Sequence, residues 1–328
     1  MSEKRLRLAL IGAGSFVRKA HAPALAAMQD RVQVVAVCSR SHKSAATVAE
    51  MLPEPVEIYD HIPSLLAVET LDAVDVVLPI PMLPDVVQMA LEAGKHVVSE
   101  KPIAPTSGRA RELIALHQQR PNQVWMVAEN YRYEQAYRAA AQAIADGAIG
   151  KPLVFDWSLQ LPVDPDSPYY RTEWRRTNQY PGGFVLDGGV HHVAGLRTVL
   201  GEIVEVGGIH AAHREDLPPM DTLAAWIRCA SGAVGTYTVT YAAGSPLSDN
   251  ALHVVGDQGS LRVNGGRLVV HNNEGTQEQT FGRPFSVELE LAAFVDAVQE
   301  GRPHRNTPEE AFRDLLVVEA LLGDGVTG

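Results

Sequence analysis

Short apolar runs alternate with amphipathic stretches through the first 130 residues of the chain. Most of these runs are rich in valine, which is typical of parallel strands buried on both faces. We expect strands at Leu6–Ile11, Val32–Val37, Val56–Tyr59, Ala73–Leu78, His96–Ser99 and Val124–Val127. We expect helices between them at Ala20–Met28, Ser44–Met51, Pro84–Glu92 and Ser107–Arg120. This βαβ series predicts an α/β fold with a doubly wound parallel sheet and a ligand at the carboxyl ends of its strands.

The pattern changes near residue 130, where longer strands follow a helix at Glu134–Asp146. The strands expected there are Leu153–Leu161, Val204–His213, Leu223–Cys229, Val234–Tyr241, Leu252–Val255, Ser260–Val263 and Leu268–His271. Turn signals such as Asn264-Gly-Gly266 separate several of them, which indicates an antiparallel meander. The remaining helices are expected at Gly188–Leu200, Ser286–Glu300 and Pro308–Leu322. We therefore predict a dinucleotide-binding domain over residues 1–130 and an α+β domain over residues 131–328, with closing helices able to pack back on the first.

The strand expected at Val234–Tyr241 has two chemically different faces. Between Thr236 and Tyr241 the threonines share one face, and Tyr237, Val239 and Tyr241 share the other. A large sheet with helices on one side leaves its second face open. Pairing of subunits through that face and exposure of the face to solvent are both compatible with this pattern.

Composition and charge narrow the classes of function. No apolar run approaches the ~20 residues that span a bilayer, and the N-terminus lacks a signal-peptide core and cleavage site. The two cysteines, Cys38 and Cys229, cannot form a disulfide framework, so we expect a cytoplasmic protein without membrane association. A formal net charge of −11 without a basic run disfavours nucleic-acid binding.

The first strand ends in Gly12-Ala-Gly14-Ser-Phe-Val17. In a mononucleotide-binding unit the first glycine makes a tight turn, and the second lets a pyrophosphate approach the backbone before a helix. Val17 stands where a third glycine is usual, and a lone G-x-G is a weak signal without its βαβ context. With that context, we predict that Gly12, Gly14, Ser15 and Phe16 contact a dinucleotide.

The second strand ends at Ser39-Arg40, with His42 and Lys43 close by. An NAD-binding unit usually carries an acid here for the ribose 2′-hydroxyl, whereas a hydroxyl and a guanidinium suit a 2′-phosphate. We therefore predict NADP(H) over NAD(H), with Ser39 and Arg40 as ligands. The alternative is that Arg40 is a solvated loop residue.

The fifth strand leads into Ser99-Glu100-Lys101-Pro102. Pro102 biases Lys101 toward an extended conformation, so the lysine side chain leaves the strand end into the crevice. A lysine there can give a proton to a substrate oxygen or take one from it. Taken alone, Glu-Lys-Pro is a common loop tripeptide.

A second group of polar residues lies near the middle of the chain, after Trp174-Arg175 and Gly182-Gly183. Asp187 and His191 are four residues apart and share one face of a helix. The helix dipole alone would favour an acid near the start of this helix. A second histidine at metal-ligand spacing is missing, and His192 points to another face, so no metal site is predicted.

These motifs together resemble the glucose–fructose oxidoreductase / inositol dehydrogenase (Gfo/Idh/MocA) family over nearly the whole chain. The segments that carry the resemblance are Gly12–Gly14, Glu100–Pro102, Trp174–Arg175, Gly182–His191 and Glu290–Pro303. Within the family, the segments that look like an NADP-linked branch are Glu129–Tyr133, Tyr169–Arg175 and Asp187–His192.

The resemblance implies an N-terminal Rossmann domain and a C-terminal α+β domain with an open, mostly antiparallel sheet. It implies a Lys101–Pro102 peptide that is often cis, and homodimers or homotetramers formed through the sheet face. In similar enzymes, residues at the positions of Lys101 and His191 handle the proton of the reacting hydroxyl. The residue at Asp187 orients substrate or histidine, and hydride passes to or from nicotinamide between the domains.

The chain departs from the family after the fourth strand. Many members have Thr-Pro-Asn there with a histidine three residues later, whereas this chain has Leu78-Pro79-Ile80-Pro81-Met82-Leu83. Cofactor contacts near Pro79 then involve more backbone and apolar surface. Glu100 and Lys101 complete the expected cofactor site.

The loop Gln160–Pro181 mixes aromatic and hydrogen-bonding side chains, which suits a sugar or cyclitol, although an irregular surface loop would have a similar composition. The residues predicted to bind substrate are Asn130, Arg132, Tyr170, Trp174, Arg175 and His192.

The sequence thus predicts an NADP(H)-dependent oxidoreductase that interconverts an alcohol and a carbonyl on a small polar molecule. Lys101 is the expected principal acid/base or oxyanion donor, with His191 as its partner and Asp187 as the orienting residue. One alternative is a sugar-modifying enzyme that recycles its cofactor within each turnover. Another is a dinucleotide-sensing regulator, against which the joint presence of these three residues argues.

Overall fold

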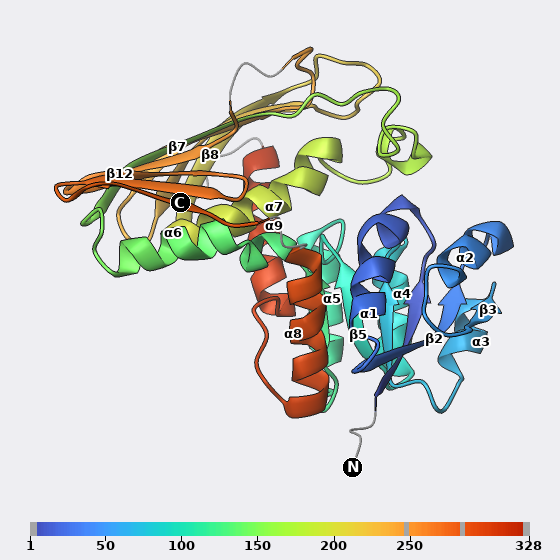
Figure 1. Cartoon of the computed structure of the whole chain (residues 1–328). Coiled ribbons are helices and arrows are strands. Elements are labelled where there is room, and N and C mark those ends of the chain that lie inside the picture. Colours follow the sequence, from blue (N-terminus) through green and yellow to red (C-terminus); the bar gives the residue numbers. More distant parts are fainter. Residues whose placement is uncertain (1–4, 246–248, 283–285, 324–328) are drawn as a thin grey trace. The chain divides into compact units, whose positions relative to one another are not determined.

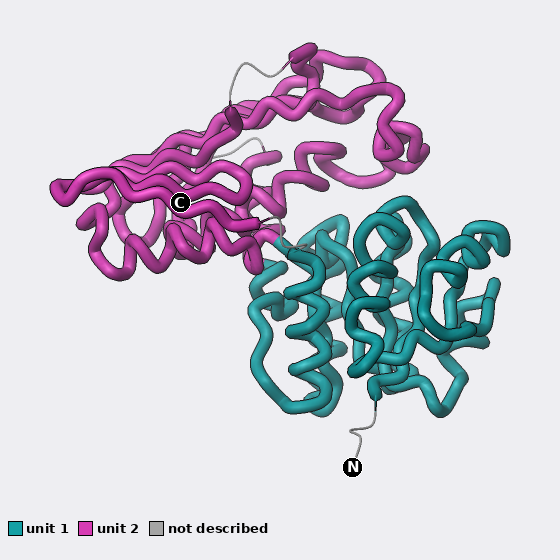
Figure 2. The backbone as a smooth tube through the Cα atoms, viewed as in Figure 1, with its two compact units in different colours: residues 1–130, 285–312 teal, residues 131–284, 313–328 magenta. Residues whose placement is uncertain are grey.

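The computed structural model describes residues 5–245, 249–282 and 286–323. Within these ranges the chain forms two compact units (Figure 2). The first contains residues 5–130 and 286–312, and the second contains the described residues from 131 to 282 together with 313–323. Helix α8 (Ser286–Glu300) thus belongs to the first unit, and helix α9 (Pro308–Leu322) begins in the first unit and ends in the second.

The first unit is an α/β fold, as predicted. Among its described residues, a six-stranded sheet runs in the order β3-β2-β1-β4-β5-β6, and every neighbouring pair is parallel. Its strands are β1 (Leu6–Ile11), β2 (Val32–Cys38), β3 (Glu57–Tyr59), β4 (Ala73–Val76), β5 (His96–Glu100) and β6 (Trp125–Ala128). Its other helices are η1 (Val17–His21), α1 (Ala22–Ala27), α2 (His42–Ala49), α3 (Ile62–Leu66), α4 (Leu83–Glu92) and α5 (Ser107–Gln118). The strand order reverses between β1 and β4, and such a point is where doubly wound sheets bind ligands.

The first helix starts three residues before its predicted beginning. A π-helical turn, η1, runs from Val17 to His21 and continues into α1. Val17 is fully buried in the same apolar cluster as Leu25 and Val37. The valine at the expected third-glycine position therefore fills the space between helix and sheet.

The second unit contains the predicted mostly antiparallel sheet. Within the described residues, eight strands run in the order β14-β13-β12-β11-β7-β10-β9-β8. They are β7 (Pro152–Gln160), β8 (Ile203–Ala211), β9 (Thr222–Cys229), β10 (Val234–Thr240), β11 (Leu252–Gly256), β12 (Gly259–Asn264), β13 (Arg267–Asn272) and β14 (Gly275–Thr280). The helices are η2 (Asn130–Tyr133), which starts at the last residue of the first unit, α6 (Gln135–Ala145), η3 (Glu173–Arg175) and α7 (Gly183–Leu200).

The sheet is not a simple meander. Strand β7 comes first in the sequence but lies between β11 and β10, and it is parallel to β10. Its alternating residues Phe155, Trp157 and Leu159 are buried, which fits a central strand. Strand β14 has only polar or glycine residues, all exposed, so its sequence carries no hydrophobic signal.

Helices α6 and α7 cover one face of this sheet (Figure 1). The predicted division of β10 is confirmed, because Tyr237 and Val239 are fully buried and Thr236 is exposed. The outer face carries half-exposed apolar residues, and Val154 lies opposite both Val234 and Val255 in the register. Pairing of subunits through this outer face stays a prediction.

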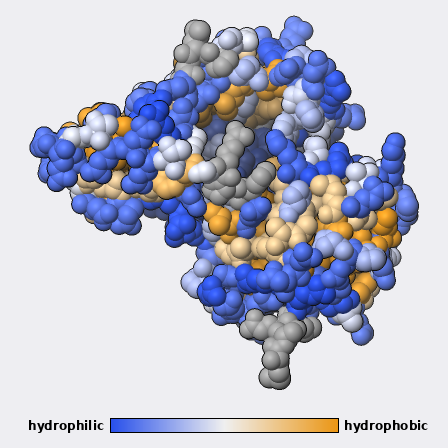
Figure 3. Space-filling view, viewed as in Figure 1, coloured by the Kyte–Doolittle hydropathy of each residue, from blue (hydrophilic) through white to orange (hydrophobic). Residues whose placement is uncertain are grey.

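Hydrophilic side chains cover much of the surface that is visible in Figure 3. Among the described residues, no helix has both the length and the apolar character needed to cross a membrane.

Candidate active site

The glycine turn after β1 has the geometry of a phosphate cradle. Gly12 has φ +118°, and a Cβ added there would lie 2.2 Å from the carbonyl oxygen of Val77, so only glycine fits. Gly14 is exposed, and no described atom lies within 4 Å of where its Cβ would stand. The Arg18 guanidinium donates to the Ala13 carbonyl at 2.7 Å and fastens the turn. An anionic ligand can therefore come close to this backbone.

Phe16 in the turn and Pro79 after the neighbouring strand β4 are two further positions predicted to contact the cofactor. Phe16 packs edge-on against the ring of His21, with 5.3 Å between the ring centroids. Pro79 follows β4, and its carbonyl accepts the N–H groups that open α4. Ile80 and Leu83, which stand where many family members carry asparagine and histidine, are buried. The cofactor contacts expected here are therefore limited to backbone and apolar atoms.

The end of β2 presents cationic side chains. The Ser39 hydroxyl accepts the N–H of Ser41 at 3.3 Å. Arg40, His42 and Lys43 are exposed. Within the described part of the chain, Arg40 makes no hydrogen bond or ion pair, so its guanidinium is available to a phosphate.

Lys101 follows β5 and is half-buried. Its peptide bond to Pro102 is cis, as the resemblance implies. The Lys101 N–H donates to Glu100 Oε2 at 3.3 Å. Since parallel strands end at the same edge of their sheet, the fold brings Lys101 to the edge that also holds Gly12, Arg40 and Pro79.

Sequence reasoning missed a buried histidine beside this edge. His21 is fully buried, with Nδ1 2.7 Å from Asp75 Oδ2 and Nε2 3.0 Å from Glu100 Oε1. Burial alone lowers the pKa of His21, but the two carboxylates outweigh it and raise that pKa well above its ordinary value. The available sequence signal was Asp75, an acid within the apolar strand Ala73–Val76.

Glu290 of α8 is a second buried ionisable group in this unit. It is 1% exposed, and Asn306 Nδ2 donates to its Oε2 at 3.2 Å. Burial, followed by the negative charge of Glu100, raises the pKa of Glu290 well above its ordinary value. The carboxyl group is therefore protonated in the folded protein at pH values where the unfolded chain releases the proton.

Glu290→Gln is expected to stabilise the protein increasingly as pH rises. Because the folded state retains a proton that the unfolded state loses, the free energy of unfolding of the unaltered chain falls above the ordinary pKa of 4.5. The fall is at most about 1.4 kcal/mol per pH unit and ends at the folded-state pKa. Glutamine keeps an acceptor for Asn306 and removes the titration. Chemical denaturation of both proteins from about pH 5 to about pH 8 measures the difference, and a difference that does not vary with pH would contradict the assignment.

In the second unit, two glycines set the start of α7. Gly182 is left-handed with φ +79°, and a Cβ on Gly183 would lie 2.5 Å from the carbonyl oxygen of Pro218. Asp187 lies one turn inside the helix rather than at its end. Its Oδ2 accepts from Arg175 Nε at 2.9 Å, so a guanidinium as well as the dipole stabilises the carboxylate.

The adjacent histidines have different surroundings. His191 is half-buried and stacks on Tyr131, with 4.8 Å between centroids and 19° between planes. His192 is buried against the sheet, where its Nδ1 lies 2.6 Å from the Tyr237 hydroxyl and its ring meets Trp157 edge-on. The predicted contact of His192 with substrate stays a prediction, and the structure gives its ring a place in the core.

Of the other residues predicted to bind substrate, three belong to the loop Gln160–Pro181 and two follow β6. The Arg175 guanidinium lies 4.1 Å above the ring of Trp174, so these two residues lie together with Asp187. Tyr170, from the same loop, is half-buried against the apolar core.

Asn130 and Arg132 already have partners within their own units. Asn130 Nδ2 donates to the Ser286 hydroxyl at 2.8 Å, and the Arg132 guanidinium donates to the carboxylate of Asp314. Their predicted contacts with substrate are untested, and these bonds restrict the positions their side chains can take.

Two tyrosines near Asp187 were also missed. The hydroxyls of Tyr180 and Tyr241 are buried and have no hydrogen-bond partner among the described atoms. Burial, with a contribution from the Asp187 charge, raises the pKa of both phenols. A Cβ on Gly188 would lie 1.8 Å from the Tyr241 hydroxyl, so this glycine is what admits the phenol. Tyr241 lies 54 positions after Asp187 in the sequence, so its proximity to this aspartate is a property of the fold.

No group of three or more histidine, cysteine or acidic side chains capable of holding a metal occurs among the residues that the structure describes. The first unit thus presents a glycine turn and a lysine at the same sheet edge. The second unit presents an aspartate and a histidine on one helix, beside aromatic and cationic side chains.

Comparison with known proteins identifies this chain as an oxidoreductase with a domain that binds a nicotinamide dinucleotide. Residues 6–128 match the model of an oxidoreductase family with an NAD-binding Rossmann fold, and residues 137–262 match that of the GFO/IDH/MocA C-terminal domain. The chain belongs to the Gfo/Idh/MocA family.

Three similar proteins show how far the likeness extends. Dehydrogenase FPY6 of Fusarium mangiferae is 30% identical, over 96% of this chain and 95% of its own length. The dTDP-3,4-didehydro-2,6-dideoxy-alpha-D-glucose 3-reductase of Actinomadura kijaniata is 27% identical, over 96% and 94%. The crystal structure of an oxidoreductase from Thermotoga maritima superposes with a TM-score of 0.91 at 30% identity, covering 97% of this chain and 96% of that one.

Proposed function

We propose that this protein is an NADP(H)-dependent oxidoreductase that interconverts an alcohol and a carbonyl on a small, sugar-like molecule. The observation that carries the proposal is the shared sheet edge in the first unit. There the exposed Gly14 backbone and the half-buried Lys101 both follow strand ends of one parallel sheet. An amine that can transfer a proton thus lies at the edge proposed to receive the dinucleotide.

When bound, the nicotinamide supplies a hydride to the carbonyl carbon or accepts one from the alcohol carbon. In the direction of reduction, the Lys101 ammonium donates a proton to the substrate oxygen as that oxygen gains negative charge. In the direction of oxidation, the neutral amine takes the hydroxyl proton. His191 serves as the second proton-handling group, and Asp187, held by Arg175, orients substrate or histidine.

Two observations support a sugar-like substrate. The Arg175 guanidinium lies 4.1 Å above Trp174 and 5.3 Å above Tyr169, which combines apolar surface with hydrogen-bond donors. Polyhydroxylated ligands need both. The relative from Actinomadura kijaniata is named as a reductase of a deoxysugar nucleotide.

A substrate screen tests the proposal. Ketosugars and aldehydes are incubated with NADPH, and polyols and aldoses with NADP⁺, while the absorbance of the reduced nicotinamide is followed. We expect net oxidation or reduction with at least one class. Product analysis runs beside it, because conversion without a net absorbance change would show that the cofactor is recycled within each turnover. Failure of every compound in both assays would contradict the proposal.

Arg40→Ala is expected to weaken NADP⁺ binding by on the order of 10-fold or more, because a charged hydrogen bond to the 2′-phosphate is lost. NAD⁺ lacks that phosphate, so its Kd is expected to stay within about 2-fold. Fluorescence titration of both cofactors measures the two constants.

Arg138→Ala is the matched control, since Arg138 is exposed and lies on α6 in the other unit. Tighter binding of NAD⁺ than of NADP⁺ by the unaltered protein would overturn the preference.

A further inference from the structure

A continuous polar chain links the core of the first unit to the backbone of Lys101. It begins at Asp75 in the middle of β4, passes through the ring of His21 and reaches Glu100 at the end of β5. The side chains of Asp75 and His21 are fully buried, and that of Glu100 is 12% exposed. The sequence separations are 54 and 79 residues, so only the fold assembles this chain.

Glu100 uses its two oxygens differently. Oε1 faces His21 Nε2 at 3.0 Å, and Oε2 accepts the N–H of Lys101 at 3.3 Å. An imidazole that holds one oxygen therefore fixes the plane of the carboxylate, and the second oxygen fixes the peptide that carries the lysine. A tether of this kind restricts where the lysine side chain starts.

The charges around His21 determine which protonation state of its ring is favoured. Asp75 and Glu100 contact its two nitrogens, Glu290 and Glu129 are the further carboxyl groups of this cluster, and Phe16 covers one edge. Both direct partners are acceptors when ionised, and a neutral imidazole can donate from only one nitrogen. The imidazolium donates to both, which matches the raised pKa of His21.

We infer that His21 is a positioning residue that sets the location of Lys101 through the carboxylate of Glu100. The inference rests on the proposed role of Lys101 in proton transfer. Asp75 anchors the far side of the ring, so the imidazolium is held from within the core while Glu100 carries its position to the sheet edge.

Two substitutions separate the contact of His21 with Asp75 from its contact with Glu100. In His21→Asn the amide nitrogen takes the place of Nδ1, which keeps the bond to Asp75 and loses the bond to Glu100. In His21→Gln the longer side chain brings the amide nitrogen to the place of Nε2, which keeps the bond to Glu100 and loses the bond to Asp75. Both variants remove the same buried cation, so each serves as the stability control for the other.

We expect H21N to lower kcat by on the order of 10-fold or more, because small displacements of a reacting group cost that much. The KM for NADP(H) should change far less than kcat. H21Q should retain several-fold more turnover than H21N, although both variants lose thermal stability. The substrate is the screened compound with the highest turnover.

Amide hydrogen exchange at Lys101 supplies a readout that needs no substrate. The exchange rate of the Lys101 N–H should rise in H21N and stay close to that of the unaltered protein in H21Q. Equal kcat and equal exchange in the two variants would show that His21 only stabilises the fold, and would overturn the inference. A K101A variant with normal turnover would instead refute the proposed role of Lys101, and the exchange measurement keeps the two failures distinct.

Discussion

Lys101→Ala is expected to lower kcat by on the order of 10²–10⁴-fold, the usual contribution of a positioned acid or base. The ammonium group neutralises the substrate oxygen as hydride is transferred, and alanine has no proton to give. NADP(H) affinity should change little, because the glycine turn and the cationic end of β2 remain intact. Steady-state kinetics and fluorescence titration measure the two effects separately.

Lys19→Ala is the matched control. Lys19 is exposed and belongs to the same unit, where it lies on η1 rather than at the end of β5. Its replacement removes the same charge without removing the proposed proton donor. Near-normal turnover of the Lys101 variant would take this lysine out of the mechanism.

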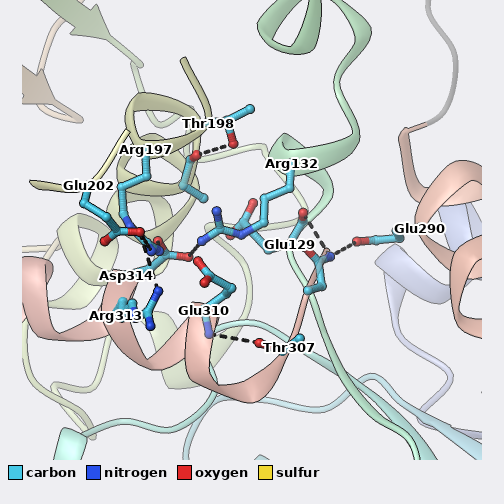
Figure 4. A network of polar contacts seen from close by, with 12 residues as sticks. Glu129, Arg132, Arg197, Thr198, Glu202, Glu290, Thr307, Glu310, Arg313 and Asp314 are labelled. Carbon is cyan, nitrogen blue, oxygen red and sulfur yellow. Dashed lines mark hydrogen bonds and ion pairs between the residues drawn. The ribbon is translucent and has the colours of Figure 1, made fainter. Parts of the chain in front are cut away.

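The largest loss of stability is expected from Asp314→Ala. Asp314 is 1% exposed, and its two oxygens accept from Arg132 at 2.5 Å and from Arg197 at 2.6 Å (Figure 4). Both guanidinium groups are buried, so removing the carboxylate takes away the partner that they share, while Arg197 keeps its bond to Glu202 at 2.7 Å. A buried ion pair broken in this way costs about 3–5 kcal/mol.

Denaturant unfolding of the whole chain measures this loss. Glu309→Ala provides a control on the same helix, because Glu309 is an exposed acid of α9. Asp314→Asn keeps the shape and one acceptor, so its loss should fall between those of the two alanine variants. A loss for Asp314→Ala no larger than that for Glu309→Ala would show that the network adds nothing to stability.

The same network bears on Arg132, which the sequence suggested as a substrate ligand. Asp314 lies 182 residues further along the chain, so no local pattern indicates this pairing. An arginine that follows a strand end can face a ligand or the core with the same sequence around it. Which of the two it contacts depends on the helix that packs against it, and for Arg132 the contacting residue lies on α9.

Much of the fold follows from local patterns. The short apolar runs, most of them rich in valine, predicted each strand of the parallel sheet, and in the inner strands burial on both faces leaves a continuous apolar signal. Strand β14 was not predicted, because its exposed residues have no apolar face. Helix α3 was not predicted, because five residues are too few to show a helical period. The central position of β7 in the second sheet was not predicted either, because strand order depends on contacts between residues distant in the sequence.

The sequence by itself determined the fold class, the glycine turn at Gly12 and the strand-end position of Lys101. These features depend on backbone conformation and on hydrophobic periodicity, which neighbouring residues specify. The tertiary structure alone decided that His21 joins Asp75 to Glu100, and that two phenol hydroxyls lie buried near Asp187. A buried polar group must find its partner wherever the chain supplies one, and that partner is set by packing between distant segments.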